Sequence, residues 1–568
     1  FVETLMLKAK LMYSDSESDP SNLLQVRSLY RIADTVLTEV QNELISSEDK
    51  LRLSEKIYEL SQFAIANCLR LADATGDRQY LEEAFRYAEK SKNTVLTQSI
   101  TANHAKQFTG IPDSLVVLED QLQSNIRYYK LRLSEQPDSA STVLYQNELF
   151  TAEQSYRALV RQLEDKYPLY HQLKYDRTVP RMRAIQFAMP ANTALVSYFV
   201  ADTVLYSFVI TRDNLSVHRA AIGSDFYAQQ VGLRKSIYWQ LNEDYLDLAN
   251  RLYQKLFPFT LDSNVKSLII IPDGILSKLP FEALLTRQIN PGNQIEFSRL
   301  PYLLKDYQVS YALSGALFYQ QQMAAANAET FDGGLLAYAP VFSEPQDVGL
   351  FNNGTRNPLS VVGGGEMGRT ITMDGKYVSA LPATADEVQA IAEVFQKKGQ
   401  KVITYMFQNA SEDQLKQGNL QNSKYVHIAT HGFINEAQPD LSGLLLFPDS
   451  TEQEDHILYS GEVYGLHLQA KLVVLSACET GLGKVASGEG ILGLSRAFFY
   501  AGAENLVVSL WKVQDRATAD LMVKFYEQHL NADNQTFAKP LREAKLDMIR
   551  SGAFSHPYFW SSFVLIGQ

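Results

Sequence analysis

The spacing of the apolar residues changes near residue 190, and this change constrains the fold more than any other feature of the chain. Before about residue 170 they recur every three or four positions, the period of amphipathic helices. After about residue 192 they gather in short runs that alternate with helical segments. We therefore expect an all-α region followed by an α/β region within the 568 residues.

The first part of the helical region, residues 1–110, is predicted to be a stack of antiparallel helices. Apolar stripes run along residues 26–44 and 53–71, with a break between them. Ala84 and Ala88 share one face of the next helix and allow another helix to approach closely. Their segment resembles a tetratricopeptide repeat (TPR), but no self-match recurs at a period of about 34 residues. We therefore describe this part as a degenerate, TPR-like helical array.

Residues 111–175 are predicted to form a long helical hairpin or linker. Two amphipathic stripes, at residues 115–129 and 145–163, flank a Pro-Asp-Ser turn at residues 137–139. Two interpretations are open. The hairpin is a structural stalk, which the sequence alone slightly favours, or it is an arm that binds a partner through its apolar stripes.

Residues 176–568 are predicted to form the α/β region, in two parts at 176–400 and 401–568. The first strands read as a meander, and the later strands are apolar on both faces and separated by helices. Such strands are typical of a largely parallel sheet with helices on both faces. Residues 342–379, rich in Gly, Asn, Ser and Pro, read as a mobile surface loop. Strands are expected at residues 195–200, 204–210, 215–218, 268–271, 308–312, 335–338, 402–405, 425–429, 472–476 and 506–509.

The composition excludes several classes of protein. Lys and Arg number 52 against 64 Asp and Glu, a net charge of −12, so a basic nucleic-acid-binding module is not expected. The longest apolar runs fall far short of the roughly 18 residues of a membrane span. The two cysteines, Cys68 and Cys478, form no disulfide framework, and a cytoplasmic location is expected. The chain starts at Phe1 rather than Met, which leaves open whether a segment of the natural protein precedes it.

Two predicted strands end in side chains suited to nucleophilic catalysis. Residues 425–429 lead to His431 and Gly432, and residues 472–476 lead to Cys478. Reactive groups of a parallel sheet collect beyond the carboxyl ends of its strands. A thiol has an ordinary pKa of about 8.5 and only its thiolate attacks carbonyl groups well, so a nearby imidazole is needed as a base. The backbone N–H groups of Gly432 and Cys478 are candidate donors to the oxyanion.

Each of these residues also has a purely structural interpretation. A single cysteine at a strand end is usually inert, and His431 could simply satisfy local hydrogen bonds. Cys68 belongs to a predicted buried stripe and is interpreted as a core residue. A zinc site formed by His427, His431 and Cys478 is disfavoured, because residues four apart on a strand are separated by about 13 Å. His427 is therefore interpreted as a structural neighbour, and no metal or other cofactor is expected.

Taken together, the two motifs resemble those of the caspase-like (clan CD) cysteine peptidases. His431-Gly432 and Ala477-Cys478 each follow an apolar strand, as the His-Gly and Ala-Cys signatures of that family do. Within the family the chain resembles the CHAT domains, which are associated with tetratricopeptide repeats and related to separase. The resemblance covers about two thirds of the chain, with matches at residues 271–274, 279–282, 381–384, 387–388, 429–432, 475–478, 488–490, 495–498, 501–503, 509–513 and 558–560.

The resemblance implies a caspase-like α/β domain in which Cys478 is the nucleophile and His431 the general base, without an obligatory third acid. In separase-like members an acidic residue shortly after a Trp-containing strand binds a basic substrate side chain, and Asp515 stands at the matching position. A carboxylate there would pair bidentately with guanidinium. The alternative is that Asp515 merely caps the helix beginning near Arg516.

The function that this resemblance implies is that of an intracellular, bacterial cysteine endopeptidase acting on a specific protein. The helical region would control it by binding an activating protein or another ligand. Defence or programmed cell death is the expected role, with a gasdermin-like pore former or another operon-encoded effector as substrate. Direct binding to nucleic acid or to a membrane is not expected. Two alternatives are open: a non-enzymatic scaffold with the same fold, and a thiol acyltransferase or transpeptidase.

Overall fold

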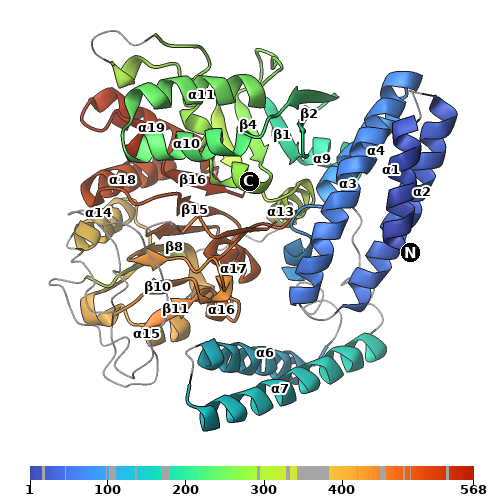
Figure 1. The fold of residues 1–568 in the computed structure, drawn as a ribbon. Helices are drawn as coiled ribbons and strands as arrows, with labels where there is room; N and C mark the ends of the chain where they lie inside the picture. The colour runs from blue at the N-terminus through green and yellow to red at the C-terminus, as the bar shows by residue number, and fades with distance from the viewer. Residues whose placement is uncertain are drawn as a thin grey trace.

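The computed structural model describes most of the chain (Figure 1). The predicted surface loop at residues 342–379 and the predicted nucleophile Cys478 lie outside the described residues. No helix in the described part of the chain combines the length and the apolar composition needed to cross a bilayer. The structure describes residues 1–15, 19–44, 47–97, 99–100, 111–134, 137–167, 170, 179–290, 295–327, 333–341, 381, 383–418, 420–447, 456–477, 480–486, 488–532 and 536–567.

The N-terminal helices stack as antiparallel neighbours, drawn in blue in Figure 1. Asp19 caps the second helix by accepting a hydrogen bond from the Ser21 amide, and Pro20 follows the cap. Cys68 is only 1% exposed, and burial raises the pKa of its thiol. The predictions of stacked helices and of a core cysteine are confirmed. The helices are α1 (Val2–Asp15), α2 (Pro20–Glu43), α3 (Ser47–Thr75) and α4 (Gln79–Lys90).

The described strands include eleven that form one sheet in the order β3-β2-β1-β4-β5-β16-β15-β12-β8-β6-β7. β1, β4 and β5 pair in parallel, and so do β15, β12, β8, β6 and β7. The prediction of a largely parallel sheet is confirmed, and every predicted strand is present. The strands are β1 (Thr193–Val200), β2 (Val204–Ile210), β3 (Leu215–Ala221), β4 (Ser267–Ile271), β5 (Gln308–Tyr311), β6 (Gly334–Ala339), β7 (Val402–Met406), β8 (Ser423–Ala429), β12 (Leu472–Ser476), β15 (Leu506–Ser509) and β16 (Phe563–Ile566).

β16 joins the two parallel parts of the sheet. It is parallel to β5, through the pair Ile566 and Tyr311, and antiparallel to β15. The parallel strands on the two sides of β16 therefore run in opposite directions. Sequence analysis did not predict β16, nor the smaller sheets formed by β9 (Gly432–Phe433), β10 (Gly443–Leu445) and β11 (Ile457–Tyr459), and by β13 (Lys484–Ala486) and β14 (Gly490–Leu492).

Helices cover both faces of the sheet, as predicted. Figure 1 shows α10, α11, α14, α18 and α19 on one side of the sheet, and α13, α17 and the N-terminal helices on the other. Tyr198 of β1 joins the core beneath α10 and α11, whereas Leu195 and Phe199 join the core of the N-terminal helices. The Tyr58 ring of α3 stacks on Phe199, with 4.7 Å between ring centroids. The additional helices are α9 (Met182–Ala188), α10 (Phe226–Tyr238), α11 (Asn242–Leu256), α13 (Gly315–Asn327), α14 (Ala383–Lys397), α17 (Leu494–Tyr500), α18 (Asp515–Asn531) and α19 (Ala538–Ser551).

The predicted hairpin consists of α6 (Asp113–Ser134) and α7 (Ser139–Lys166), at the bottom of Figure 1. Asp138 caps α7 by accepting hydrogen bonds from two backbone amides of its first turn. Leu163 is buried in a small apolar cluster between the helices, whereas Phe150 on α7 is 62% exposed. The hairpin is thus held together by a short apolar seam and leaves other apolar side chains in solvent.

Candidate active site

The strands that lead to His431 and Cys478 are neighbours in the sheet. β8 and β12 pair in parallel, with Ala429 opposite Ser476 at their carboxyl ends. In the sequence, His431 and Cys478 each come two residues after this pair. The described strands therefore leave the sheet side by side at one edge. Because Cys478 lies outside the described residues, its pairing with His431 stays a prediction.

His431 stands where the chain passes from β8 to the small sheet. Its backbone carbonyl accepts a hydrogen bond of 2.9 Å from the Leu445 amide of β10, and the Thr430 hydroxyl donates to the Leu445 carbonyl. The His431 side chain is fully buried, whereas Gly432, a predicted oxyanion donor, is partly exposed. The imidazole therefore occupies a position with little water, where electrostatic interactions are stronger than in solvent.

The carboxylate of Glu387 on α14 connects β8 to β12. Its Oε1 lies 3.1 Å from His427 Nε2 on β8 and accepts a 2.6 Å hydrogen bond from the Ser476 hydroxyl on β12. On the other side of the ring, His427 Nδ1 lies 3.3 Å from the Tyr526 hydroxyl. Burial and the nearby Glu387 carboxylate raise the pKa of Tyr526 and keep its hydroxyl protonated. This buried network fixes the relative position of the two strands just before they reach the candidate site.

Sequence analysis did not assign Glu387 a place beside the site. A signal was available, because Glu387 shares a helical face with the buried residues Val388, Ile391 and Phe395. A carboxylate within an apolar stripe needs a buried partner, since an isolated buried charge is very costly. His427 is one such partner, in agreement with its interpretation as a structural residue rather than a zinc ligand.

Residues on both sides of Cys478 are anchored to the end of β15. The Ser509 hydroxyl donates to the Ala477 carbonyl, and the Gly481 amide donates to the Ser509 carbonyl at 2.8 Å. A Cβ atom at Gly481 would lie 2.8 Å from a methyl group of Val508, so only glycine fits there without a shift. β15 therefore holds both ends of the short segment that contains the predicted nucleophile.

The hairpin β13–β14, which follows this segment, touches the helical region at its tip. The Gly488 carbonyl accepts a hydrogen bond of 2.6 Å from the Asn93 amide, in the turn after α4. The Glu489 carboxylate accepts from the Val95 amide at 3.1 and 3.2 Å and pairs with Arg496 at 3.2 Å. Glu489 is fully buried, and burial raises the pKa of its carboxyl. The turn after α4 is thus connected directly to the loop that follows the candidate site.

Asp515 is the first residue of α18 and Gln514 holds the N-cap position, so the alternative in which Asp515 caps this helix is wrong. Its side chain is partly exposed. The strand before it, β15, pairs with β12, so Asp515 and Cys478 follow neighbouring strands. An acidic residue in the first turn also interacts favourably with the helix dipole. The start of α18 therefore accounts for Asp515 without a substrate, and its role in recognition stays a prediction.

The chain matches a known domain family over more than half of its length. The model of the CHAT domain matches residues 246–568. Tetratricopeptide repeat protein 28 of Homo sapiens is 37% identical over 153 residues, and its Mus musculus counterpart is 34% identical over 154 residues. Each match covers 27% of this chain but 6% of the relative, so the chain spans only a small fraction of the relatives it matches.

The fold is also similar to that of a solved structure. Two crystal structures of the Saccharomyces cerevisiae separase–securin complex match with TM-scores of 0.51 and 0.53 at 10% identity. Each match covers 99% of this chain and 40% of the matched chain. The architecture is therefore a caspase-like α/β domain preceded by a helical region, and the chain belongs to the CHAT domain family.

Proposed function

We propose that the protein is a cysteine endopeptidase in which Cys478 is the nucleophile and His431 the general base. The observation that carries this proposal is the pairing of β8 with β12, which puts Ala429 opposite Ser476. Ala429 comes two residues before His431, and Ser476 comes two residues before Cys478. The caspase-like fold and the membership of the CHAT family support the same chemistry. The buried Glu387 network supports it too, because it gives the two strands one fixed relative position.

In the proposed reaction, His431 takes the thiol proton and Cys478 Sγ attacks the carbonyl carbon of a peptide bond. The backbone N–H groups of Gly432 and Cys478 stabilise the oxyanion, and loss of one such donor costs roughly 3 kcal/mol. The C–N bond then breaks, the amine leaves with the proton held by His431, and a thioester remains. Water hydrolyses the thioester, which releases a carboxylic acid and restores the thiol.

We propose Asp515 as the residue that binds a basic substrate side chain before the scissile bond. The support is its partly exposed carboxylate, placed after the strand that neighbours β12, and the bidentate pairing of carboxylate with guanidinium. The substrate would be a specific intracellular protein, either a gasdermin-like pore former or another operon-encoded effector, in bacterial defence or programmed cell death. Asp515→Asn should shift cleavage away from Arg and towards Leu; an unchanged preference would remove this assignment.

We also propose that the helical region controls the peptidase through the turn after α4. The support is the pair of contacts that Asn93 and Val95 make with Gly488 and Glu489. A protein that displaced α4 would pull on the hairpin β13–β14 and therefore on the segment that contains Cys478. The separase structure that shares this fold is itself a complex with a second protein, securin, which favours control by a bound partner.

Labelling with an electrophilic peptide that carries Arg tests the activity. We expect one covalent adduct, lost in Cys478→Ala and formed at least about 100-fold more slowly in His431→Ala, since base assistance contributes about 10² to 10⁴. Cys68→Ala is the matched control, because it removes the other cysteine of the chain and should leave labelling unchanged. Equal labelling of the Cys478→Ala variant would contradict the proposal and favour the scaffold alternative. Mass analysis of peptide products would separate hydrolysis from acyl transfer.

A further inference from the structure

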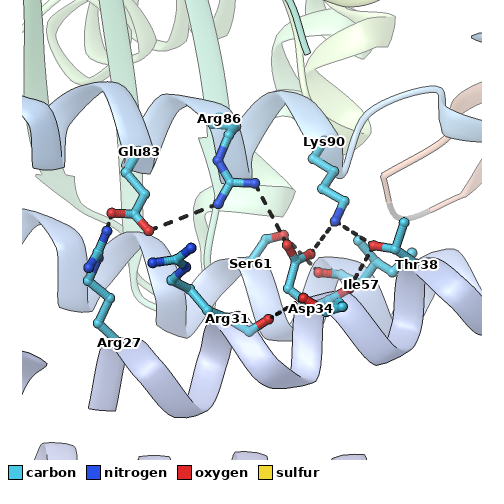
Figure 2. A network of polar contacts seen from close by, with 10 residues as sticks. Arg27, Arg31, Asp34, Thr38, Ile57, Ser61, Glu83, Arg86 and Lys90 are labelled. Carbon is cyan, nitrogen blue, oxygen red and sulfur yellow. Dashed lines mark hydrogen bonds and ion pairs between the residues drawn. The ribbon is translucent and has the colours of Figure 1, made fainter. Parts of the chain in front are cut away.

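A polar cavity of about 410 Å³ lies between α2 and α4 in the helical region. Three arginines line it, Arg27 and Arg31 from α2 and Arg86 from α4, together with the carboxylates of Asp34 and Glu83. Figure 2 shows these side chains gathered between the two helices. Most surface ion pairs contribute little to stability, so three guanidinium groups around one cavity call for a reason beyond the fold.

The carboxylates of the cavity are already paired. Glu83 accepts a 2.7 Å hydrogen bond from Arg27 Nε, and Asp34 accepts one of 2.5 Å from Lys90 Nζ. Both carboxylate side chains are only 11% exposed, less than the Arg27 side chain at 25%. They form the floor of the cavity, and their two bound cations hold them in place.

Two of the guanidinium groups keep donors to spare. Arg86 reaches Asp34 and Glu83 only at 3.7 and 4.0 Å, longer than a hydrogen bond, and its side chain is 39% exposed. The Arg31 guanidinium has no ion pair or hydrogen bond with any residue that the structure describes. In Figure 2 it points into the space between the helices, below Arg86. Each guanidinium carries five N–H donors, so Arg31 and Arg86 together have several donors left to bind a ligand in the cavity.

The charges around the cavity identify the class of ligand. Arg27, Arg31, Arg86 and Lys90 supply four positive charges against two carboxylates, an excess of two, in a chain whose net charge is −12. The planar fork of guanidinium matches the geometry of a carboxylate. The net charge of −12 repels a long polyanion more strongly than a short acidic segment, which disfavours a nucleic acid.

From these contacts we propose that the cavity binds acidic side chains of a partner protein, held by Arg31 and Arg86. Thr35 and Gln79, which also line the cavity, supply neutral hydrogen-bonding groups beside the bound carboxylate. Binding itself does not depend on peptidase activity. Its effect on the peptidase rests on the proposed function, because α4 continues directly into the turn that contacts Glu489.

Fluorescence anisotropy with a labelled peptide of four consecutive Glu residues tests the site. The full chain should bind this peptide at least about 10-fold more tightly than the matching Gln peptide, and high salt should remove the difference. Arg31→Ala and Arg86→Ala should each weaken binding about 10-fold. Arg52→Ala removes the same charge from an exposed position of α3 outside the cavity and should leave binding unchanged. The Cys478→Ala background protects the peptide from cleavage.

Three results would overturn the proposal. The first is that the Glu and Gln peptides bind equally tightly, or that neither binds at millimolar concentration. The second is that Arg31→Ala binds the Glu peptide as tightly as Arg52→Ala does. A phosphoserine peptide or a single-stranded oligonucleotide binds more tightly than the Glu peptide and depends on Arg31, which would assign the cavity to phosphate instead. Loss of probe labelling at Cys478 with intact peptide binding would remove the peptidase assignment and leave this site standing. Arg31 is exposed and its guanidinium has no partner among the described residues, so its replacement should not disturb folding, and Arg31→Gln serves as a second variant.

Discussion

The helical region meets the two parts of the sheet in different ways. Against the first part it packs an apolar surface, in which Tyr58 stacks on Phe199. Against the hairpin of the second part, the turn after α4 contributes hydrogen bonds to Gly488 and Glu489. Apolar packing is strong but non-directional, whereas hydrogen bonds depend on angle and distance. We therefore expect the first contact to anchor the helices, and under the proposed function the second would transmit their position.

Each contact also contains a buried carboxyl. Asp273, two residues after β4, accepts hydrogen bonds of 2.7 Å from the Tyr58 hydroxyl and from the Val200 amide. Glu489 accepts from the Val95 amide and from Arg496. Burial raises the pKa of both carboxyls. The difference is that Asp273 lies at the edge of an apolar core, whereas Glu489 is itself the main contact.

The largest expected effect is on the apolar contact. Phe199→Ala should lower the free energy of unfolding by about 3–5 kcal/mol, because it removes a fully buried ring that packs on Tyr58. Urea unfolding followed by circular dichroism measures the change. Phe150→Ala, at a ring 62% exposed on α7, is the control and should cost under about 0.5 kcal/mol. Equal losses in the two variants would show that the helices are not anchored by this core.

The second-largest effect is expected when Gly488, in the polar contact, is replaced. Its φ is +76°, and an added Cβ would lie 2.3 Å from the Ser91 carbonyl oxygen. Gly488→Ala should therefore cost about 2–3 kcal/mol and speed hydrogen exchange at the Asn93 and Val95 amides. Gly399 has a similar φ of +69° with nothing near its Cβ position, so Gly399→Ala should cost only about 1 kcal/mol. Unchanged exchange in the Gly488 variant would argue against a tight turn–hairpin contact.

The smallest effect is a change in pH dependence at Glu489. Its folded pKa is above its unfolded value, so the folded state binds the proton more tightly than the unfolded state. The stability that the protonated carboxyl contributes is complete below the unfolded pKa of about 4.3 and is lost as pH rises through the folded pKa. The Glu489→Gln variant has no carboxyl at this position that could ionise. The stability of this variant relative to the natural protein should therefore increase as pH rises from about 4. Parallel stability curves from urea titrations at several pH values would contradict this.

The sequence predicted the strands well because their signal is local. Residues 268–271, 425–429 and 472–476 are short apolar runs bounded by turns, and each is a strand at nearly the same residues. The order of the strands and the reversal at β16 were not predictable, because they depend on contacts between distant segments. The reversal follows from the parallel pair of Ile566 with Tyr311 together with the antiparallel pairing of β16 with β15.

For the candidate site, the sequence identified the chain segments better than the network around them. Its motifs pointed to the ends of two strands that turn out to be parallel neighbours. The link through Glu387 was missed, since it joins residues 40 and 89 positions apart in the sequence. Glu489 was noted only as part of a motif, because its partner Val95 lies 394 positions away. Such polar contacts leave no periodic pattern in a single sequence.

The position of β16 has a consequence for biosynthesis. This strand lies between β5 and β15, yet it is made after every other strand of the sheet. Until residue 566 has left the ribosome, the two parts of the sheet have no strand to join them, and the segments leading to His431 and Cys478 belong to only one of the parts. The sheet of a nascent chain would therefore stay open until β16 has been made, which would delay any activity that needs the closed sheet.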